Sequence, residues 1–432
     1  MTAATTPPPA RGRRRRRAKL PAGALARNTA WMLMGNGSRL VLQLATFVAL
    51  TRVLGSAGFG AFAGVLALVS LAVPFVSLGA GNVMVKNTAR DPAAFVASYR
   101  TALKVTAVSG AALFAGALLV APLLLPPNVP RLLVACVAGG DLLVAGFYDT
   151  SWKAYQAFNR MRRVAQLQLL LSGLKLAAAL ALGFLVPAPS PARWAALYAL
   201  CTLGTGAAAL WLTHRELVAP AKRGAAPPFD AVEGFYFSTS LAAQNVYNDL
   251  DKTMLVRLST LEATGIYAAA YRMVELAYLP VRSLFYATYA DFFQRGRRGV
   301  RATLAFGRGL MPAGLGYAAA VSAAILAAAP LIPLVSGSGF QEAAEAARWL
   351  APIPLLRATH HFAADILSGA GRQGARTAMQ VVVAVANLLV NLWLIPAYGW
   401  KGAAWASVLS DGLLAILMWA TVWTALRREA AG

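Results

Sequence analysis

Charged residues are scarce in this chain of 432 residues, where they make up 13% of the sequence. Ordinary soluble domains carry about 25%. Hydrophobic residues make up 58%, and the mean hydropathy is +0.58. A water-exposed surface cannot be built from this composition, which excludes a soluble enzyme, a disordered chain and a fibrous protein. The composition predicts an all-α polytopic membrane protein.

Cysteine and histidine are also nearly absent. Cys136 and Cys201 both lie in apolar runs, so they provide neither a disulfide framework nor a cysteine-type metal site. With three histidines, a zinc site would need carboxylates from several helices, and we expect no metal. The chain has no Walker-type phosphate-binding loop and no loop long enough for a catalytic domain. We therefore expect a protein that is not an enzyme and binds no cofactor.

Basic residues are the exception, because 40 Lys and Arg stand against 16 Asp and Glu, for a net charge of +24. With the amino terminus placed in the cytoplasm, the predicted cytoplasmic segments hold 28 basic residues and the opposite side holds 6. Basic loops remain in the cytoplasm, so this asymmetry predicts that both termini are cytoplasmic. The charge thus records an orientation, and we expect no nucleic-acid partner.

A transmembrane helix needs about 20 mainly apolar residues, and twelve such segments can be counted. Residues 1–26, which precede them, are rich in Pro, Ala and Arg, and we expect a disordered cytoplasmic tail near anionic membrane lipids. The predicted segments run approximately over 28–51, 60–84, 101–123, 131–150, 165–186, 193–213, 236–256, 266–289, 305–330, 349–369, 376–396 and 402–424.

The second half of the chain repeats the first. Arg52 and Gly60 recur as Arg257 and Gly265, and further pairs keep an offset of 205 to 212 residues. Each half holds six segments, so both halves enter the membrane from the same side. We expect two six-helix lobes around a central cavity, which is typical of transporters. The expected lobes cover 27–215 and 235–432, with a cytoplasmic linker at 216–234.

Leaving aside the four residues at each end, the predicted segments contain six basic and six acidic residues. Charges in a membrane are expensive and usually face protein or water, so each marks a candidate site. Some of them have a simple structural interpretation as ion pairs that hold helices together. Arg272 with Glu275 and His361 with Asp365 stand at salt-bridge spacing.

Arg39 and Lys175 differ, because neither has an acidic neighbour on its own segment. Their partners therefore lie on another helix or on a substrate. An anionic substrate suits them, since the Arg fork matches phosphate oxygens and Lys supplies a point charge. Carboxylates nearby either balance these cations or carry H⁺ or Na⁺ for coupling.

Polar side chains follow one face of several segments at helical spacing, which completes the set of candidates. The candidate substrate-binding residues are Arg39, Gln43, Lys175, Asn248, Lys252 and Asn387. The candidate residues for coupling or charge balance are Asp249, Asp251, Glu275 and Asp365.

Several stretches resemble the Wzx-type polysaccharide flippases of the multidrug/oligosaccharidyl-lipid/polysaccharide exporter superfamily. They cover the start of each half and two cytoplasmic turns. These stretches are Asn28-Thr29-x-Trp31, TRVLGSAGFGAFAGV at 51–65, SLGAGNVMVKNTAR at 77–90, YQAFNRMRRVAQ at 155–166, NDLDKTMLVRLSTLEATGIYAAAYRM at 248–273 and LSGAGRQGA at 367–375.

The resemblance implies a transporter that moves an undecaprenyl-diphosphate-linked oligosaccharide from the cytoplasmic to the outer leaflet of the bacterial plasma membrane. It implies alternating access between two lobes, a cavity arginine near Arg39, and functional charges at Asp249, Asp251 and Lys252. Proteins of polysaccharide biosynthesis are its expected partners, besides the lipid-linked substrate and membrane lipids.

Two alternatives remain open. A cation-coupled multidrug exporter of the same superfamily favours an acidic, aromatic cavity, against which the balance of six basic and six acidic residues argues. A membrane glycan polymerase or ligase requires nucleophile-like residues at the outer face, and the outer loops contain none.

Overall fold

The computed structural model describes residues 22–221, 224, 231–296 and 298–431. Over these residues the chain is almost entirely helical and contains no strand. Residues 1–21 of the predicted tail and part of the predicted linker lie outside the described residues. The prediction of an all-α membrane protein is confirmed.

The first half of the chain forms the helices α1 (Ala22–Ala72), η1 (Val73–Phe75), α2 (Ala80–Arg90), η2 (Pro92–Ala94), α3 (Phe95–Leu124), α4 (Arg131–Ala138), η3 (Gly139–Val144), α5 (Ala145–Ala157), α6 (Met161–Phe184), α7 (Pro191–Thr213) and η4 (His214–Val218). The second half forms α8 (Ala231–Leu258), α9 (Leu261–Gly296), α10 (Val300–Ala328), η5 (Ala329–Leu331), α11 (Ile332–Ser336), η6 (Ser338–Phe340), α12 (Gln341–Leu350), α13 (Ile353–Gly369), α14 (Gln373–Tyr398) and α15 (Trp400–Ala431).

By length and hydropathy, eight segments of the described chain are able to cross a membrane. The first of them, Gly37–Phe75, has 39 residues and contains a break at Gly55, so it holds two of the predicted spans. Helices α8, α9 and α13 are too polar or too short for that criterion but coincide with predicted spans. Together these helices account for the twelve predicted spans.

Gly55 breaks α1 because its backbone has φ 66° and ψ −179°. A residue with a Cβ is strongly disfavoured in this conformation, whereas glycine adopts it readily. The chain therefore turns here between its first and second spans. Helix α1 packs against α8 and α9 of the second half.

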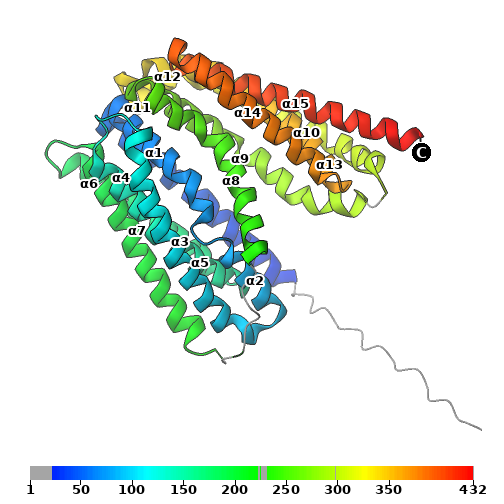
Figure 1. The fold of residues 1–432 in the computed structure, drawn as a ribbon, viewed down its shortest axis with the longest axis horizontal. Coiled ribbons are helices and arrows are strands. Elements are labelled where there is room, and N and C mark those ends of the chain that lie inside the picture. The colour runs from blue at the N-terminus through cyan, green and yellow to red at the C-terminus, as the bar shows by residue number, and fades with distance from the viewer. Residues whose placement is uncertain (1–21, 222–223, 225–230, 297, 432) are drawn as a thin grey trace, which may run out of the picture.

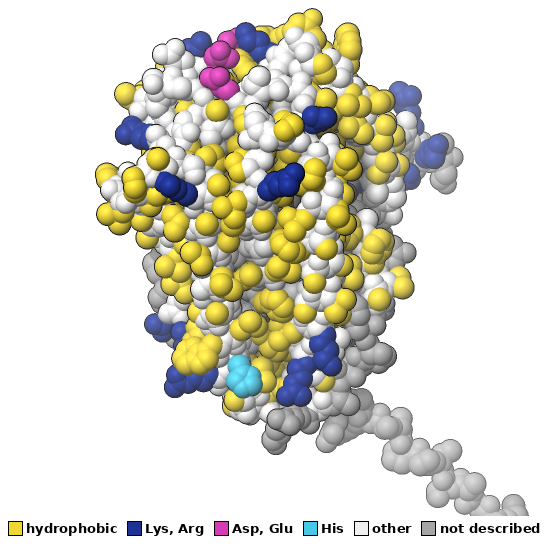
Figure 2. Space-filling model, turned by 60° about the vertical axis from the view of Figure 1, so that its left-hand side comes forward, with side chains coloured by type: hydrophobic (Ala, Val, Ile, Leu, Met, Phe, Trp, Pro, Cys, Tyr) yellow, Lys and Arg dark blue, Asp and Glu magenta, His cyan; other side chains and the backbone are white. Residues whose placement is uncertain are grey.

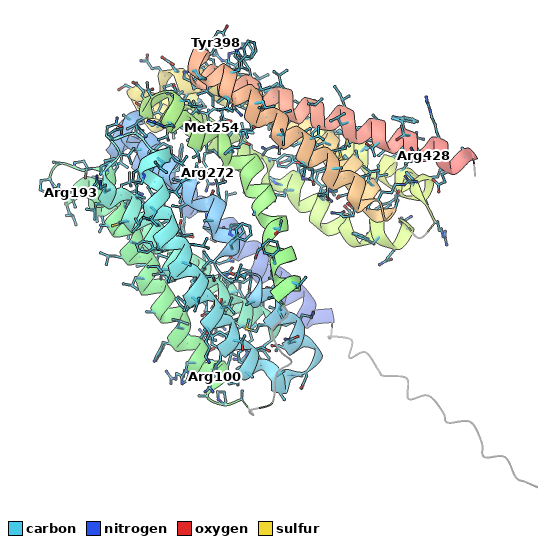
Figure 3. The ribbon with its side chains drawn as sticks, viewed as in Figure 1. Arg100, Arg193, Met254, Arg272, Tyr398 and Arg428 are labelled. Atoms are coloured by element: carbon cyan, nitrogen blue, oxygen red, sulfur yellow. The ribbon has the colours of Figure 1, made fainter. Side chains whose placement is uncertain are left out.

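The two halves of the chain meet at one end and diverge toward the other (Figure 1). Arg193 and Tyr398 lie on the side where they meet, whereas Arg100 and Arg428 lie far apart at the opposite end (Figure 3). We call these the closed end and the open end of the molecule. Arg272 lies between them, facing the space enclosed by the two halves (Figure 3).

Glycines at the start of each repeat allow the two backbones to touch at the closed end. A Cβ added to Gly60 would lie 2.6 Å from the amide nitrogen of Gly265, and one added to Gly265 would lie 2.0 Å from the carbonyl oxygen of Ser56. Gly60 and Gly265 occupy equivalent positions in the sequence repeat, so the repeat brings its own matching residues into contact. This is the behaviour expected of two halves related by an approximate twofold axis.

Polar and aromatic contacts reinforce the closed end. Arg52 donates from Nε and Nη2 to the carbonyl oxygens of Val335 and Leu334, at 2.7 and 2.9 Å. These carbonyls lie in the last turn of α11, where such groups lack helical partners. Phe59 packs edge-on against Phe340 of the second half, with ring centroids 6.3 Å apart. The closed end is therefore sealed by backbone contact, hydrogen bonds and ring packing.

The outer surface is consistent with a membrane environment. Many large apolar side chains are exposed, among them Phe184, Leu119 and Trp393, each at least three-quarters exposed. One face shows a broad apolar region with Lys and Arg gathered toward its two ends (Figure 2). Such a surface is stable in lipid and would aggregate in water.

Gly265→Ala tests the backbone contact at the closed end. Elsewhere in a helix this change is favourable by up to about 1 kcal/mol, but here the added Cβ collides with a backbone carbonyl. We expect a lower apparent melting temperature in detergent. Gly412→Ala in α15 is the matched control, because no atom lies within 4 Å of its added Cβ. Equal melting temperatures for both variants would contradict the contact.

Candidate functional site

A cavity of about 700 Å³ lies between the two halves below the closed end. Its walls come from α1, α5, α6 and α7 of the first half and from α8 and α9 of the second. Leu50, Phe59, Phe62 and Trp194 line its part nearest the closed end. The cavity therefore sits where the two repeats face each other, as the sequence predicted.

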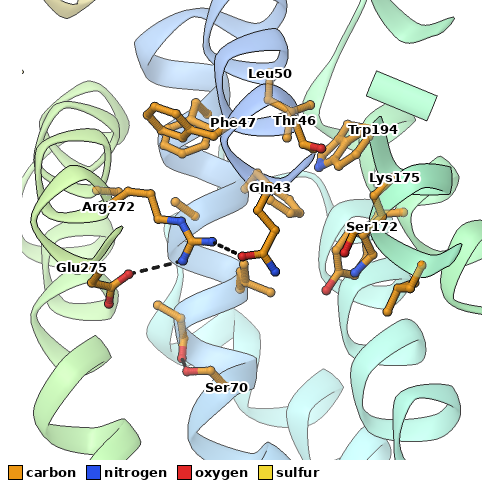
Figure 4. Close-up of a pocket in the computed structure, with 18 of the residues that line it drawn as sticks. Gln43, Thr46, Phe47, Leu50, Ser70, Ser172, Lys175, Trp194, Arg272 and Glu275 are labelled. Carbon is orange, nitrogen blue, oxygen red and sulfur yellow. Dashed lines mark hydrogen bonds and ion pairs between the residues drawn. The ribbon is translucent and has the colours of Figure 1, made fainter. Parts of the chain in front are cut away.

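The first half contributes a wall with two cations and several rings. Arg39 and Gln43 line the cavity one helical turn apart on α1. Lys175 of α6 lies across from Gln43 (Figure 4). In the part of the chain that the structure describes, Arg39 makes no ion pair or hydrogen bond. Lys175 likewise makes no ion pair, and its Nζ lies 3.6 Å from the centroid of the Tyr198 ring.

The second half contributes cations that are already paired. Lys252 of α8 donates to Asp249 at 2.7 Å, and Arg272 of α9 contacts Glu275 at 3.3 Å. Arg272 also donates to Gln43 of the first half at 3.3 Å (Figure 4). The prediction that Arg272 and Glu275 form an ion pair is confirmed.

A second polar contact crosses the cavity. Ser70 of α1 donates to the other carboxylate oxygen of Asp249 at 3.1 Å. Asp249 is thus held between a hydroxyl of the first half and the ammonium of Lys252. Contacts of this kind stabilise one arrangement of the two halves and must break when that arrangement changes.

The charge of the lining is asymmetric. Four cations and two carboxylates reach the cavity: Arg39, Lys175, Lys252, Arg272, Asp249 and Glu275. The two carboxylates pair with the cations of the second half, so the surplus positive charge lies on the first half. This arrangement attracts an anion and disfavours a cation, and the weak screening of an enclosed site strengthens both effects.

Two candidate residues lie inside the second half, away from the lining. Asn387 is buried, donates to Ser410 at 2.9 Å and accepts from Asn391 at 2.9 Å. Asp251 is buried as well and accepts hydrogen bonds from the Tyr267 hydroxyl and from Ser407. The side chains of both residues are turned toward neighbouring helices of their own half.

The expected pair of His361 and Asp365 is wrong. Asp365 lies 3.9 Å from Arg376 at the start of α14, and the ring of His361 contacts the Tyr278 hydroxyl at 3.3 Å. His361 therefore projects toward α9, whereas Asp365 projects toward α14. The side chain of Asn248, the remaining candidate, lies outside the described residues.

A chain of buried polar groups extends from the cavity into the second half. Lys252 lies over the Tyr271 ring, with Nζ 4.3 Å from its centroid, and the Tyr271 hydroxyl accepts from Arg357. Arg357 contacts Asp411 at 3.4 Å, and Asp411 also contacts His360 at 3.2 Å. Each charged side chain in this series of buried groups has a polar partner, because an unpaired charge is unfavourable in the apolar interior.

The sequence did not reveal the aromatic part of the lining. Tyr148, Trp152, Trp194 and Tyr198 line the cavity beside the cations. Trp194 and Tyr198 are four residues apart and share a helix face, a signal that could have been read. Apolar residues on the same face made it indistinguishable from ordinary helix packing.

The arrangement offers positive charge, hydrogen-bonding groups and aromatic faces in one cavity. Among the described residues, no group of three or more His, Cys, Asp or Glu is placed to hold a metal ion. The lining offers guanidinium and ammonium donors, amide and hydroxyl groups, and aromatic faces. Such a lining is suited to a large polar, negatively charged solute.

Solved structures with the same fold are transporters. An inward-facing multidrug resistance MATE family transporter of the MOP superfamily matches with a TM-score of 0.74 and 14% identity, over 91% of this chain and 95% of that one. Its outward-facing conformation matches with a TM-score of 0.60 and 15% identity, over 94% and 96%. A MOP superfamily transporter from Pyrococcus furiosus, described as having a binding pocket of reverse polarity, matches with 0.59 and 14%, over 93% and 95%.

Fold and membrane spans together define a multi-pass membrane protein that shares its fold with solved transporters. No curated protein sequence matches the chain. The model of a family described as "Polysaccharide biosynthesis protein" matches residues 25–289, which is more than half of the sequence. The chain belongs to this family.

Cysteine labelling tests the position of the cavity. Thr46 lines it, whereas Ser410 is buried beside Asn387 in the second half. In a variant with Cys136 and Cys201 replaced by Ala, we expect Thr46→Cys to react with a water-soluble maleimide in detergent. Ser410→Cys, the control, should stay unlabelled until the protein is denatured. Equal labelling of both cysteines would contradict the position of the cavity, because it would show that the two sites are equally accessible to water.

Proposed function

We propose that this transporter flips a polyprenyl-diphosphate-linked oligosaccharide from the cytoplasmic to the outer leaflet of the bacterial plasma membrane. The observation that carries the proposal is a pair of cations that make no direct ion pair in the described chain, Arg39 and Lys175, on a cavity wall that also presents amides, hydroxyls and rings. The membership of the polysaccharide biosynthesis family supports it.

The diphosphate is the part of this substrate that is most difficult to move through lipid. Its charges must leave water and cross about 30 Å of hydrocarbon. Arg39 offers a planar fork and Lys175 a compact point charge, and these are the two usual protein groups for phosphate oxygens. They replace the hydration that the diphosphate loses, while the polyprenyl tail remains in the surrounding lipid.

The glycan needs hydrogen-bonding groups and apolar ring faces. Gln43, Thr46, Ser172 and Gln168 provide the former along the lining. Trp152, Trp194 and Tyr148 supply flat surfaces against which sugar rings can stack. These groups tolerate different sugars, because they are spread along the wall rather than gathered at one recognition point.

Alternating access describes how the substrate would cross the membrane. If the open end faces the cytoplasm, as the basic loops favour, the structure represents an inward-facing state that is sealed on the outer side. The higher TM-score to the inward-facing MATE structure than to the outward-facing one is in line with this. Breaking the contacts of Arg52, Gly60 and Gly265 would then release the substrate outward.

Coupling to H⁺ or Na⁺ would act through carboxylates that a substrate or an ion can separate from their partners. Asp249 and Glu275 are placed for this role, because they line the cavity beside Lys252 and Arg272. Asp251 and Asp365 lie deeper in the second half and would act through charge balance. Enzymes that build and polymerise the glycan are the proposed partners.

The sign of the cavity charge separates this function from drug export. A transporter of apolar cations would place uncompensated carboxylates in its lining, whereas both carboxylates here are paired and two cations are not. The two functions therefore make opposite demands on Arg39 and Lys175.

Arg39→Ala and Lys175→Ala test the proposal in proteoliposomes. We expect each to reduce translocation of a fluorescent polyprenyl-diphosphate disaccharide at least about tenfold, because each removes a charged hydrogen-bond donor from the substrate. Arg100→Ala, at the exposed open end, is the control and should retain full activity. Translocation would be followed by the access of dithionite to the fluorophore, and ethidium transport would be measured in parallel. Unimpaired flipping, or ethidium transport raised to a similar rate, would favour the drug exporter.

A reversible lock tests alternating access. A Cβ added to Gly339 would lie 4.0 Å from that of Ser56, within the usual range of disulfides. In the cysteine-free background we expect Ser56→Cys with Gly339→Cys to form a disulfide across the closed end. The lock should stop translocation, and dithiothreitol should restore it, whereas each single variant stays active. Continued flipping by the oxidised double variant would show that the closed end need not open.

A further inference from the structure

A carboxylate that does not line the cavity lies directly behind its cationic wall. Asp141 belongs to the π-helical turn η3 (Gly139–Val144), which joins α4 to α5. A π-helical turn adds one residue to the helix and changes which side chain faces inward, and such turns are frequent at functional sites. The turn aims Asp141 toward α7, which packs against it.

Asp141 is linked to the cavity through one tyrosine. The hydroxyl of Tyr198 donates a hydrogen bond to the carboxylate of Asp141. It lies 2.8 Å from one carboxylate oxygen and 3.1 Å from the other. The ring of Tyr198 lines the cavity and carries the ammonium of Lys175 on its face, 3.6 Å from the centroid. Carboxylate, phenol and ammonium therefore follow one another from the protein interior to the cavity.

This order has an electrostatic consequence. The carboxylate and the ammonium attract each other across the ring. The attraction is weakly screened, because the ring excludes water from the space between the two charges. A hydrogen bond to a carboxylate also makes the phenol more electron-rich, which favours a cation on its face. Lys175 makes no hydrogen bond within the described chain, so its three N–H groups remain available to a ligand.

A second cation makes the counter-charge necessary. Arg39 is close enough for its charge to repel that of Lys175, and it has no carboxylate partner in the described chain. Without Asp141, two uncompensated cations would share this wall. They would be costly in the empty protein, and they would hold a diphosphate too tightly for it to be released.

We propose that Asp141, acting through Tyr198, is the counter-charge of Lys175, and that it weakens the binding of an anionic ligand enough to permit release. Asp141 is thus a positioning residue that tunes the affinity of the site without contacting the substrate. The inference rests on the proposed function of the cavity as an anion site.

Two substitutions predict shifts of opposite sign. Asp141→Asn keeps an acceptor for the Tyr198 hydroxyl but removes the charge, so farnesyl diphosphate should bind about tenfold more tightly. Tyr198→Phe keeps the ring but frees the carboxylate to approach Lys175 directly, so binding should weaken by a similar factor, about tenfold. A role in packing alone would weaken binding in both variants or in neither.

The experiment is a titration of the purified full-length protein with farnesyl diphosphate, with farnesol as the ligand that lacks the charge. Lys175→Ala should lose most of the binding, and Asp141→Asn should have no effect in that background. In proteoliposomes, Asp141→Asn should lower the substrate concentration for half-maximal flipping and also lower the maximal rate, because release becomes slower.

The outcomes distinguish this inference from the function on which it rests. If wild type binds farnesyl diphosphate no better than farnesol, the anion site itself is wrong. If wild type binds and Lys175→Ala does not, the site stands, and unchanged or weaker binding by Asp141→Asn overturns the role of Asp141. If Asp141→Asn does not fold, Tyr198→Phe decides, since unchanged or tighter binding by that variant also overturns it.

Discussion

An unpaired charge costs several kcal/mol inside a bilayer, and this cost shapes the whole structure. In the second half, ion pairs reduce this cost. Arg357 and His360 share Asp411, and Lys252 binds Asp249. In the first half, Arg39 and Lys175 face a cavity instead. In the proposed function these cations face the cavity because they bind an anionic ligand there.

The two halves share a sequence repeat but differ in the charges that they present to the cavity. Their matching glycines, Gly60 and Gly265, touch at the closed end, where the approximate twofold relation is still visible. Away from that contact the halves differ in charge. The first presents aromatic rings and cations that make no direct ion pair in the described chain, and the second presents ion pairs that are connected to a buried network. In the proposed function the first half holds the anion, and the second half responds when its ion pairs are broken.

The sequence predicted the features that depend on hydropathy and helical periodicity. Each predicted span is mainly helical, although turns interrupt the spans 60–84 and 349–369. Arg39, Gln43, Lys175 and Lys252 line the cavity because they lie on the faces of α1, α6 and α8 that are turned toward it. It could not tell a polar face turned toward the cavity from one turned toward a neighbouring helix. Asn387 is of the second kind, since it bonds to Ser410 and Asn391.

Other parts of the site depend on departures from regular geometry, which periodicity does not encode. The π-helical turn at Gly139–Val144 directs Asp141 toward Tyr198, and a regular helix would have placed it about 100° away. His361 and Asp365 do not pair with each other for a similar reason. Their spacing on one helix does not account for the groups on α9 and α14 that they contact instead. Tertiary contacts between helices decided both cases.

The central claim is that the cavity binds a diphosphate between Arg39 and Lys175. A cryo-electron microscopy structure of the protein with a bound polyprenyl diphosphate tests it most directly. We expect phosphate density within hydrogen-bonding distance of both side chains, with the glycan end toward the aromatic lining. Phosphate density on the second half alone, with Arg39 and Lys175 unoccupied, would contradict it.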